Sequence, residues 1–348
     1  MNITEAQIND ITNIAFTFPQ APVEEIRRDS LIQTIDDTFK EGANVVIVEG
    51  GDGIGKTTLL MQFVNDHRFN SVCYFISPQD RYTYSPLAFN YDLYQQFYFL
   101  IKQEQLPESE ENNQLSSIRA DLDRFLRKNK DRKIFIILDG LDQIQLADLN
   151  VLSNVISDLP WGKKEQVHFL ISGKGEIVRT IIPSVGNITI GSVRVTSLSY
   201  NETESYLSDL ALDPPNIEEI HRSVQGNISK LASVKRSLRS FKGDIEDFFK
   251  ELSKSEIFEL EWNKIDETNE LQINILTILA FDDNKFTLDE LSRIFKVNTI
   301  QINNSLKNIT FNSLENEAVA YISESFRRFA KTKLKTEEKR ILDLIIDY

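Results

Sequence analysis

Cysteine is almost absent from this 348-residue sequence, and the single thiol, Cys73, excludes a disulfide bond within the chain. It lies in an apolar segment, SVCYFI, that is typical of a buried strand. No apolar run approaches the roughly 20 residues that a membrane-spanning helix needs. The N-terminus also lacks the basic flank and apolar stretch of a secretory signal. These absences argue against a disulfide scaffold and a membrane protein, and they favour the cytoplasm.

Positive charge is scarce as well, because 39 lysines and arginines stand against 53 acidic residues, for a formal net charge of −14 at pH 7. A chain that binds nucleic acid usually carries a basic stripe, so this balance disfavours nucleic acid as a partner. Only three histidines occur, and they lack the spacing of metal ligands. The composition is otherwise that of an ordinary soluble globular protein, and the length suggests two or three domains.

Short apolar runs alternate with amphipathic segments between about residues 30 and 200. Five runs are short, continuous and rich in β-branched residues, as in a parallel sheet covered on both faces. These predicted strands are Val45–Glu49, Val72–Ile76, Ile134–Leu138, His168–Ile171 and Ser192–Val195. The predicted helices between them are Gly55–Asn65, Leu87–Lys102, Leu115–Arg127 and Leu149–Leu159. This alternation predicts an α/β fold with right-handed crossovers.

The strand pattern stops after Tyr200, and short helical segments follow. Four of them predict a helical lid: Asn201–Leu210, Ile217–Val224, Ile228–Arg239 and Ile245–Ser253. Beyond them the sequence predicts a winged helix. Its three helices are Leu271–Ala280, Leu288–Phe295 and Thr299–Ile309, and its wing strand is Ala318–Ile322. Two further helices are predicted, one that begins at Phe326 and one over Thr336–Ile346. Thr287 is the expected N-cap of the helix Leu288–Phe295. We therefore predict an N-terminal segment (1–24), a nucleotide-binding domain (25–198), a lid (199–262) and a winged-helix domain (263–348).

The segment GGDGIGKTT contains the pattern G-x-x-x-x-G-K-[ST] between a predicted strand and a predicted helix. Glycines let such a loop curl so that its backbone N–H groups point at phosphate oxygens, and the positive end of the helix faces the same way. Lys56 would lie near the β- and γ-phosphates, the Thr57 hydroxyl would ligate Mg²⁺, and Thr58 would contact the α-phosphate. The predicted binding residues are Gly50, Gly51, Asp52, Gly53, Ile54, Gly55, Lys56, Thr57 and Thr58.

Acidic residues at the end of another apolar run predict the second half of this site. Asp139 follows the run KIFIIL and should hold Mg²⁺ through water. Asp142 is the candidate for polarising the attacking water; alternatively it only caps the following turn. Lys174, after the strand HFLIS, would sense the γ-phosphate, or would be an ordinary exposed lysine. The sequence thus predicts a nucleoside triphosphatase with catalytic roles for Lys56, Asp139, Asp142 and Lys174.

These motifs resemble those of the STAND-class ATPases, a group that includes the NACHT and apoptotic-ATPase proteins and bacterial antiviral sensors. GGDGIGKTTLL resembles their P-loop, and LDGLDQI resembles the NACHT-type pattern hhhhDGxDE, with Gln143 in place of a second acid. LISGKGE resembles the sensor strand, with Lys174 in the place of an arginine. QGNI resembles a glycine-Asn-Pro turn, with Ile228 replacing the proline. The resemblance covers roughly residues 25 to 345.

This resemblance implies a slow, regulatory ATPase that binds ATP or ADP with Mg²⁺ and forms a homo-oligomer on activation, in immune or antiviral signalling. Arg27 and Arg28 resemble the basic residue that borders the adenine. Ser323 stands where many relatives place a histidine on the β-phosphate of ADP, so the ADP-bound off state is expected to be weaker or to use another residue. Effector and sensor parts are expected on a partner or in a longer chain, of which we expect this sequence to be a fragment.

Two other functions compete with the switch. An AAA+ or origin-recognition-like ATPase would act on DNA through the winged helix, but acidic residues outnumber basic ones from Asp266 onward and the helix NTIQINNSLKNI has one lysine. A basic cluster on a later helix is interpreted as a solvated face or a protein contact; it comprises Arg327, Arg328, Lys331, Lys333 and Lys335. A small-molecule kinase would need an acceptor pocket, for which the sequence shows no signature.

Overall fold

The chain divides into two units, described from a computed structural model. The first comprises Met1–Gly51 and Gly55–Val195, and the second comprises Asp52–Ile54 and Thr196–Tyr348. The structure describes residues 14–19, 25–77, 80–107, 115–163, 165–183, 188–241, 243–254, 256–282, 286–306, 319–320, 322 and 324–338. No helix within these ranges is long and apolar enough to cross a membrane.

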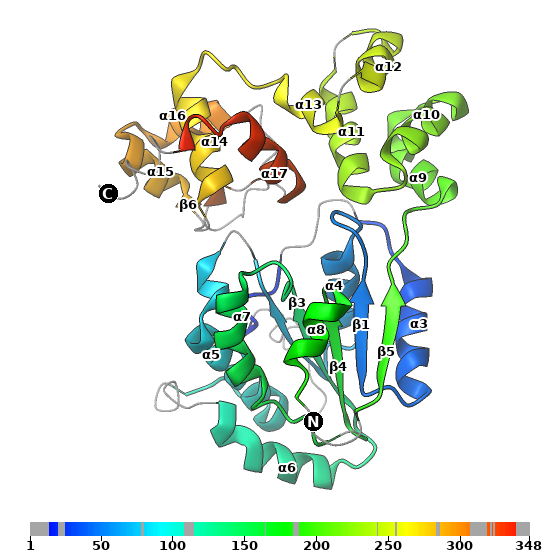
Figure 1. Cartoon of the computed structure of the whole chain (residues 1–348), viewed down its shortest axis with the longest axis vertical. Helices are drawn as coiled ribbons and strands as arrows, with labels where there is room; N and C mark the ends of the chain where they lie inside the picture. The colour runs from blue at the N-terminus through cyan, green and yellow to red at the C-terminus, as the bar shows by residue number, and fades with distance from the viewer. Residues whose placement is uncertain are drawn as a thin grey trace. The chain divides into compact units, whose positions relative to one another are not determined.

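A five-stranded parallel sheet forms the centre of the first unit (Figure 1). The strands are β1 (Val45–Glu49), β2 (Ser71–Phe75), β3 (Ile134–Asp139), β4 (Val167–Ser172) and β5 (Ile190–Arg194). They are ordered β2-β3-β4-β1-β5, and every neighbouring pair is parallel. The four strands from β2 to β1 are buried almost throughout, which explains their continuous apolar sequences. The predicted α/β fold is confirmed, with each strand within two residues of its predicted bounds.

Helices cover both faces of this sheet (Figure 1). One face is covered by α3 (Asp29–Lys40) and α4 (Lys56–Asp66), whose Phe39 and Phe63 rings meet Phe135 of β3. The other face packs in one apolar cluster with α5 (Pro86–Lys102), α6 (Arg119–Lys128), α7 (Leu146–Ile156) and α8 (Gly175–Ile181). The sequence pattern alone did not predict α8, a helix of only seven residues.

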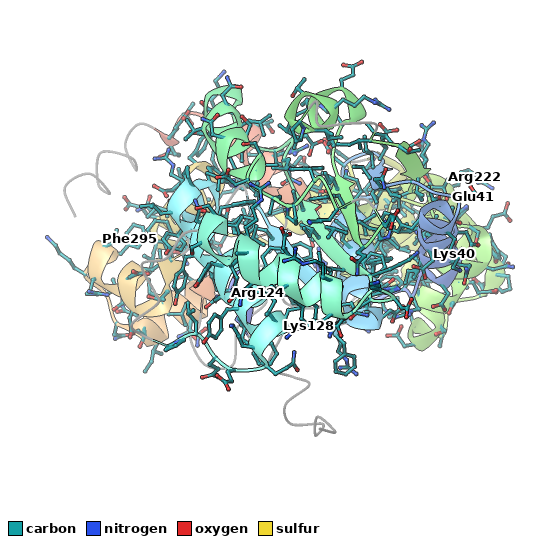
Figure 2. All side chains as sticks on the ribbon, turned by 90° about the horizontal axis from the view of Figure 1, so that it is seen from below. Lys40, Glu41, Arg124, Lys128, Arg222 and Phe295 are labelled. Carbon is teal, nitrogen blue, oxygen red and sulfur yellow. The ribbon has the colours of Figure 1, made fainter. Side chains whose placement is uncertain are left out.

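The helix α6 has the amphipathic arrangement that its sequence predicts. Leu122 and Leu126 are buried against the core, whereas Arg124 and Lys128 are exposed and extend from the helix in Figure 2. The predicted helix Leu115–Arg127 begins as a short 3₁₀ turn, Leu115–Ile118, before α6. Local apolar spacing therefore located this element correctly, although it did not resolve the change of helix type.

Backbone groups at the outer edge of β2 form hydrogen bonds with side chains. The Gln96 amide donates to the Cys73 carbonyl and accepts from the Cys73 N–H, both at 2.8 Å. The Thr17 hydroxyl accepts from the Phe75 N–H (3.2 Å) and donates to the carboxylate of Asp92 (3.0 Å). Thr17, from the predicted N-terminal segment, is thus part of the first unit and contacts β2, and Cys73 is buried as predicted.

The second unit begins with a run of helices. They are α9 (Tyr200–Leu207), α10 (Pro214–Val224), α11 (Ile228–Ser240), α12 (Ile245–Lys254) and α13 (Ile257–Trp262). The sequence starts α9 with a capping box, in which the Ser199 side chain accepts from the Glu202 N–H and Glu202 reaches back to Ser199. The four predicted lid helices are all present, while α13 was not predicted.

A second apolar cluster lies further along the same unit. It joins α14 (Glu270–Phe281), α15 (Leu288–Phe295), α16 (Thr299–Leu306) and α17 (Glu324–Lys333) with a two-stranded antiparallel ladder of β6 (Phe286–Thr287) and β7 (Val319–Ala320). Thr287 caps α15, as predicted. Most of the predicted helix Thr336–Ile346 lies outside the described residues, as does the end of Thr299–Ile309. A winged helix, and the division of the chain into four parts, remain predictions.

Arg327 corrects the interpretation of the basic cluster. Its side chain is 2% exposed, so it does not belong to a solvated face. The guanidinium donates to the carbonyls of Leu279 (3.2 Å), Ala280 (2.8 Å) and Asp282 (2.9 Å). These acceptors lie at the C-terminal end of α14, where carbonyls lack partners within the helix. The spacing of charges along the sequence could not distinguish this buried capping group from its exposed neighbour Arg328.

The imidazole of His168 on β4 is buried against the rings of Phe39 and Phe135. Burial, with a smaller effect of the Lys133 charge, lowers the pKa of His168 to about 4. In the unfolded chain the pKa is about 6.5. The unfolded state therefore binds more protons between these two values, and the free energy of unfolding should fall as the pH drops from about 6.5 towards 4.

Replacing His168 by leucine is expected to reduce this loss of stability in acid, because the substitution removes the titrating group. Denaturant unfolding measured between about pH 7 and about pH 4.5 tests the slope. Phe135→Leu is the matched control, since it thins the same cluster but keeps the imidazole. It should lower stability at every pH and leave the slope intact. An unchanged slope in His168→Leu contradicts the assignment.

Candidate nucleotide-binding site

The loop between β1 and α4 has the backbone conformation that its glycines allow. Gly53 and Gly55 have φ values of +68° and +97°, which residues with a Cβ rarely adopt. Gly55 is the N-cap, and α4 begins at Lys56. The ammonium group of Lys56 donates to the carbonyls of Gly50 (2.9 Å) and Gly51 (3.2 Å). The cation thus lies at the loop and beside the start of α4, where an anion is favoured.

Asp139, the last residue of β3, is 2% exposed, and both of its carboxylate oxygens accept hydrogen bonds. Thr57 donates to Oδ2 (2.6 Å), and the Ser172 hydroxyl donates to Oδ1. Burial raises the pKa of Asp139, while the hydrogen bonds from Ser172 and Thr57 and the charge of Lys56 oppose that rise. The predicted partners Thr57 and Asp139 therefore lie together. Ser172 was missed as a site residue, although it ends the strand HFLIS.

This set of donors fits Mg²⁺. A hydroxyl and a carboxylate are oxygen ligands of the kind that Mg²⁺ prefers, together with phosphate oxygens and water. The buried charge of Asp139 is an independent indication, because a cation beside it would offset the desolvation that raises its pKa. Thr57 and Asp139 are the residues that would hold the ion, which would neutralise phosphate charge when it binds.

Gly140 determines where an acid can follow Asp139. Its φ is +81°, and a Cβ at this position would lie 2.5 Å from the carbonyl oxygen of Ile76. No residue with a side chain fits there without movement of the Ile76 backbone after β2, so a carboxylate directly after Asp139 is excluded. The next acid is Asp142, whose carboxylate accepts from the Lys174 backbone N–H at 3.0 Å. This contact is with a residue 32 positions away and not with the turn after Asp142, so both sequence interpretations, capping of that turn and action on water, remain predictions.

Lys174 immediately precedes α8, and its side chain is exposed. It follows Ser172 at the end of β4, so it lies at the same edge of the sheet as Asp139. Its backbone N–H, rather than its amine, makes the contact with Asp142. A role for the amine on the γ-phosphate remains a prediction.

The segment around Arg27 and Arg28 is fixed to α4. Gln62, 1% exposed, donates to the carbonyl of Ile26 (3.0 Å) and accepts from the N–H of Arg28 (3.1 Å). Arg27 pairs with Asp66 (2.5 Å), one turn further along the same helix. The helix that starts at the phosphate loop thus also positions the predicted adenine-side residues. Gln62 was missed because its two partners lie more than 30 residues away in sequence.

The three loop residues Asp52–Ile54 belong to the second unit, and they form hydrogen bonds and an ion pair with other residues of that unit. The Asn227 amide donates to the Asp52 carbonyl (2.9 Å), and the Ser229 N–H donates to the Gly53 carbonyl (3.0 Å). The guanidinium of Arg328 pairs with the Asp52 carboxylate. Asn227 also caps α11 through the Lys230 N–H. Ser323, the predicted β-phosphate neighbour, lies outside the described residues.

Comparison with known proteins agrees with this architecture. Residues 25–170 match the family model described as the AAA ATPase domain. The structure is similar to that of a Signal Transduction ATPase with Numerous Domains (STAND) protein with a tetratricopeptide repeat sensor from Pyrococcus horikoshii. The TM-score is 0.58 at 17% identity, over 95% of this chain and 46% of that one. The present chain therefore spans less than half of that protein.

Two further structures are similar over most of both chains. A Walker-type ATPase of Pyrococcus abyssi matches with a TM-score of 0.50 at 14% identity, over 91% of this chain and 99% of that one. Cdc6p of Pyrobaculum aerophilum matches with a TM-score of only 0.40 at 14% identity, over 97% and 98% of the two chains. The search of curated proteins found no match. The family match and the similarity to the STAND protein show a P-loop ATPase fold of the AAA and STAND type, as the sequence motifs indicated.

The substitution Asp142→Asn distinguishes a catalytic role of Asp142 from a purely structural one. Asp142→Asn keeps an oxygen that accepts from the Lys174 N–H, but an amide cannot serve as a general base. We expect ATP binding to be unchanged and hydrolysis to fall by about 100-fold or more. Single-turnover hydrolysis and equilibrium binding measure the two effects. Asp142→Ala is the companion variant, which should in addition lower stability. Wild-type turnover in Asp142→Asn would leave only the structural role.

Proposed function

We propose that this protein is an ATP-binding regulatory switch that hydrolyses ATP slowly and oligomerises when activated. The fold and the AAA ATPase domain support nucleotide binding and hydrolysis. One observation carries the switch: the loop residues Asp52–Ile54 share a unit with Asn227, Ser229 and Arg328. A ligand that displaced Asp52–Ile54 would alter these contacts, and a ligand-driven switch requires such a differential interaction.

Slow hydrolysis follows from the arrangement of the acids. Gly140 leaves no room for a carboxylate directly after Asp139. Asp142 is the next acid, and its carboxylate is engaged by the Lys174 N–H. A water-polarising base needs a free acceptor within hydrogen-bond reach of the water. The Lys174 N–H engages only Oδ2 of Asp142, but it restrains where the second oxygen can point, so binding is expected to be stronger than turnover.

Action on DNA remains the alternative function, and α16 disfavours it. In its described span, Thr299–Leu306, this helix has no basic residue, and Ile300 is 70% exposed. A helix that binds DNA normally presents lysine or arginine to phosphates, because neutralising phosphate charge provides most of the affinity. An uncharged face with an exposed isoleucine is better suited to contact protein.

The proposal also covers the source of the activating input and the kind of signalling in which the switch acts. The P. horikoshii protein carries a tetratricopeptide repeat sensor, and the present chain corresponds to less than half of it. By analogy, a sensor or effector on a partner or in additional sequence would supply the activating input, and immune or antiviral signalling is the proposed setting. The proposed partners are therefore further copies of this chain and such a sensor or effector.

Mass in solution tests the switch directly. Light scattering on a sizing column, with Mg²⁺ and either ADP or a non-hydrolysable ATP analogue, is expected to show a larger assembly with the analogue only. Lys56→Ala is the control; it should weaken binding of both nucleotides by about 10-fold or more and abolish the shift. The same mass with ADP and with the analogue, at saturation confirmed by binding, contradicts a nucleotide-driven assembly of this chain.

The Asp52–Arg328 ion pair provides a second test. Both side chains are at least half exposed, so breaking the pair should alter ADP release by no more than about fivefold, corresponding to about 1 kcal/mol. We expect faster release from Arg328→Glu, and restoration in the charge-swapped variant Asp52→Lys with Arg328→Glu. Lys331→Glu makes the same charge change one turn further along α17. Stopped-flow release of a fluorescent ADP that is equally fast from Arg328→Glu and Lys331→Glu contradicts the coupling.

A further inference from the structure

We propose that Ser172 is a positioning residue for Mg²⁺, which acts by fixing the orientation of the Asp139 carboxylate. This inference rests on the proposed binding of ATP with Mg²⁺. It concerns a residue that would touch neither the nucleotide nor the ion.

The sheet places Ser172 between the two halves of the nucleotide site. It ends β4, the strand that pairs with β3 on one side and β1 on the other. Its backbone is in register with Val48 of β1, two residues before Gly50. The last register pair with β3 is Leu138 and Ile171, so Ser172 and Asp139 are the next residues along their strands. Ser172 is 1% exposed, and water cannot replace its hydroxyl without a rearrangement.

The hydrogen bonds of Ser172 fix the direction of its hydroxyl. A serine hydroxyl has one proton to donate and lone pairs to accept. The Gly140 N–H donates to Ser172 Oγ (3.3 Å), and Ser172 donates its proton to Asp139 Oδ1. Thr57 donates to the other oxygen, Oδ2 (2.6 Å). Each carboxylate oxygen therefore has its own hydroxyl from a different element, and the plane of the carboxylate is fixed.

A fixed carboxylate plane matters for this metal. Mg²⁺ requires near-ideal octahedral geometry, and its bound waters must find acceptors in set directions. Thr57 holds Oδ2 and is itself a proposed ligand of the ion, so Ser172, which holds Oδ1, is the restraint that does not depend on a ligand residue. Without Ser172, Oδ1 would be a buried acceptor with one partner fewer, and the carboxylate would be free to rotate.

Binding of a fluorescent, non-hydrolysable ATP analogue, titrated with Mg²⁺, tests the proposal. We expect Ser172→Ala to raise the Mg²⁺ concentration at half-maximal effect by about 10-fold or more, the range known for residues that orient metal ligands. Binding of the same analogue in EDTA should be unchanged, because the phosphate loop is intact. Ser172→Thr, which restores a hydroxyl, should return the midpoint towards wild type. If Ser172→Ala does not fold, Ser172→Cys, whose thiol is a weak donor, takes its place.

Ser71 provides a matched control within the same sheet. It is a buried serine at the start of β2, 2% exposed, and its hydroxyl donates to the carbonyl of His67 (3.0 Å). Ser71→Ala should lower the melting temperature but leave the Mg²⁺ midpoint unchanged. Equal midpoints in Ser172→Ala and wild type, or equal shifts in Ser172→Ala and Ser71→Ala, overturn the proposal. If the wild-type protein binds no nucleotide with or without Mg²⁺, the proposed function itself fails.

Discussion

The buried carboxylate of Asp139 is the constraint on which the rest of the site depends. Its removal from water favours the protonated form, and the groups that oppose this come from separate parts of the chain: Ser172 from β4, and Thr57 and Lys56 from the start of α4. None of these contacts exists in an isolated strand or loop. The electrostatics of the site are therefore a property of the assembled sheet, and a fault in strand packing would reach the phosphate site directly.

The order of the strands explains how these groups meet. In a parallel sheet the carboxyl ends of all strands lie at one edge, where α/β proteins bind their ligands. Because β4 lies between β3 and β1, the strand ends bring together residues that are far apart in sequence. Thr57 and Asp139 are 82 residues apart, and Asp139 and Ser172 are 33 apart, yet each pair is hydrogen bonded. Helices on both faces keep the sheet dry, which strengthens these polar contacts.

The sequence predicted what depends on local pattern. Continuous apolar runs located the strands, and the glycine-rich motif with its lysine and threonine located the phosphate loop and Asp139. Contacts distant in sequence were not predictable in this way. Ser172 could be recognised only once β4 was known to neighbour β3. Gln62 could be recognised only once the backbone of Ile26 and Arg28 was known to lie against α4. The buried state of Arg327 depends on the end of α14, more than 40 residues away.

Gly140 shows how packing limits chemistry. The residue is held in a left-handed conformation against the Ile76 carbonyl, while the Ile76 N–H donates to the Asp139 carbonyl at 3.0 Å. The turn after β3 is thus locked to the segment after β2, and an acid cannot occupy position 140. The next acid along the chain is Asp142, beyond the turn, and its Oδ2 accepts from the N–H of Lys174, which immediately precedes α8. This bond leaves Oδ1 able to accept, but it restrains the orientation of the only acid within three residues of Asp139. In the switch that we propose, a restrained Asp142 would favour holding a nucleotide over hydrolysing it.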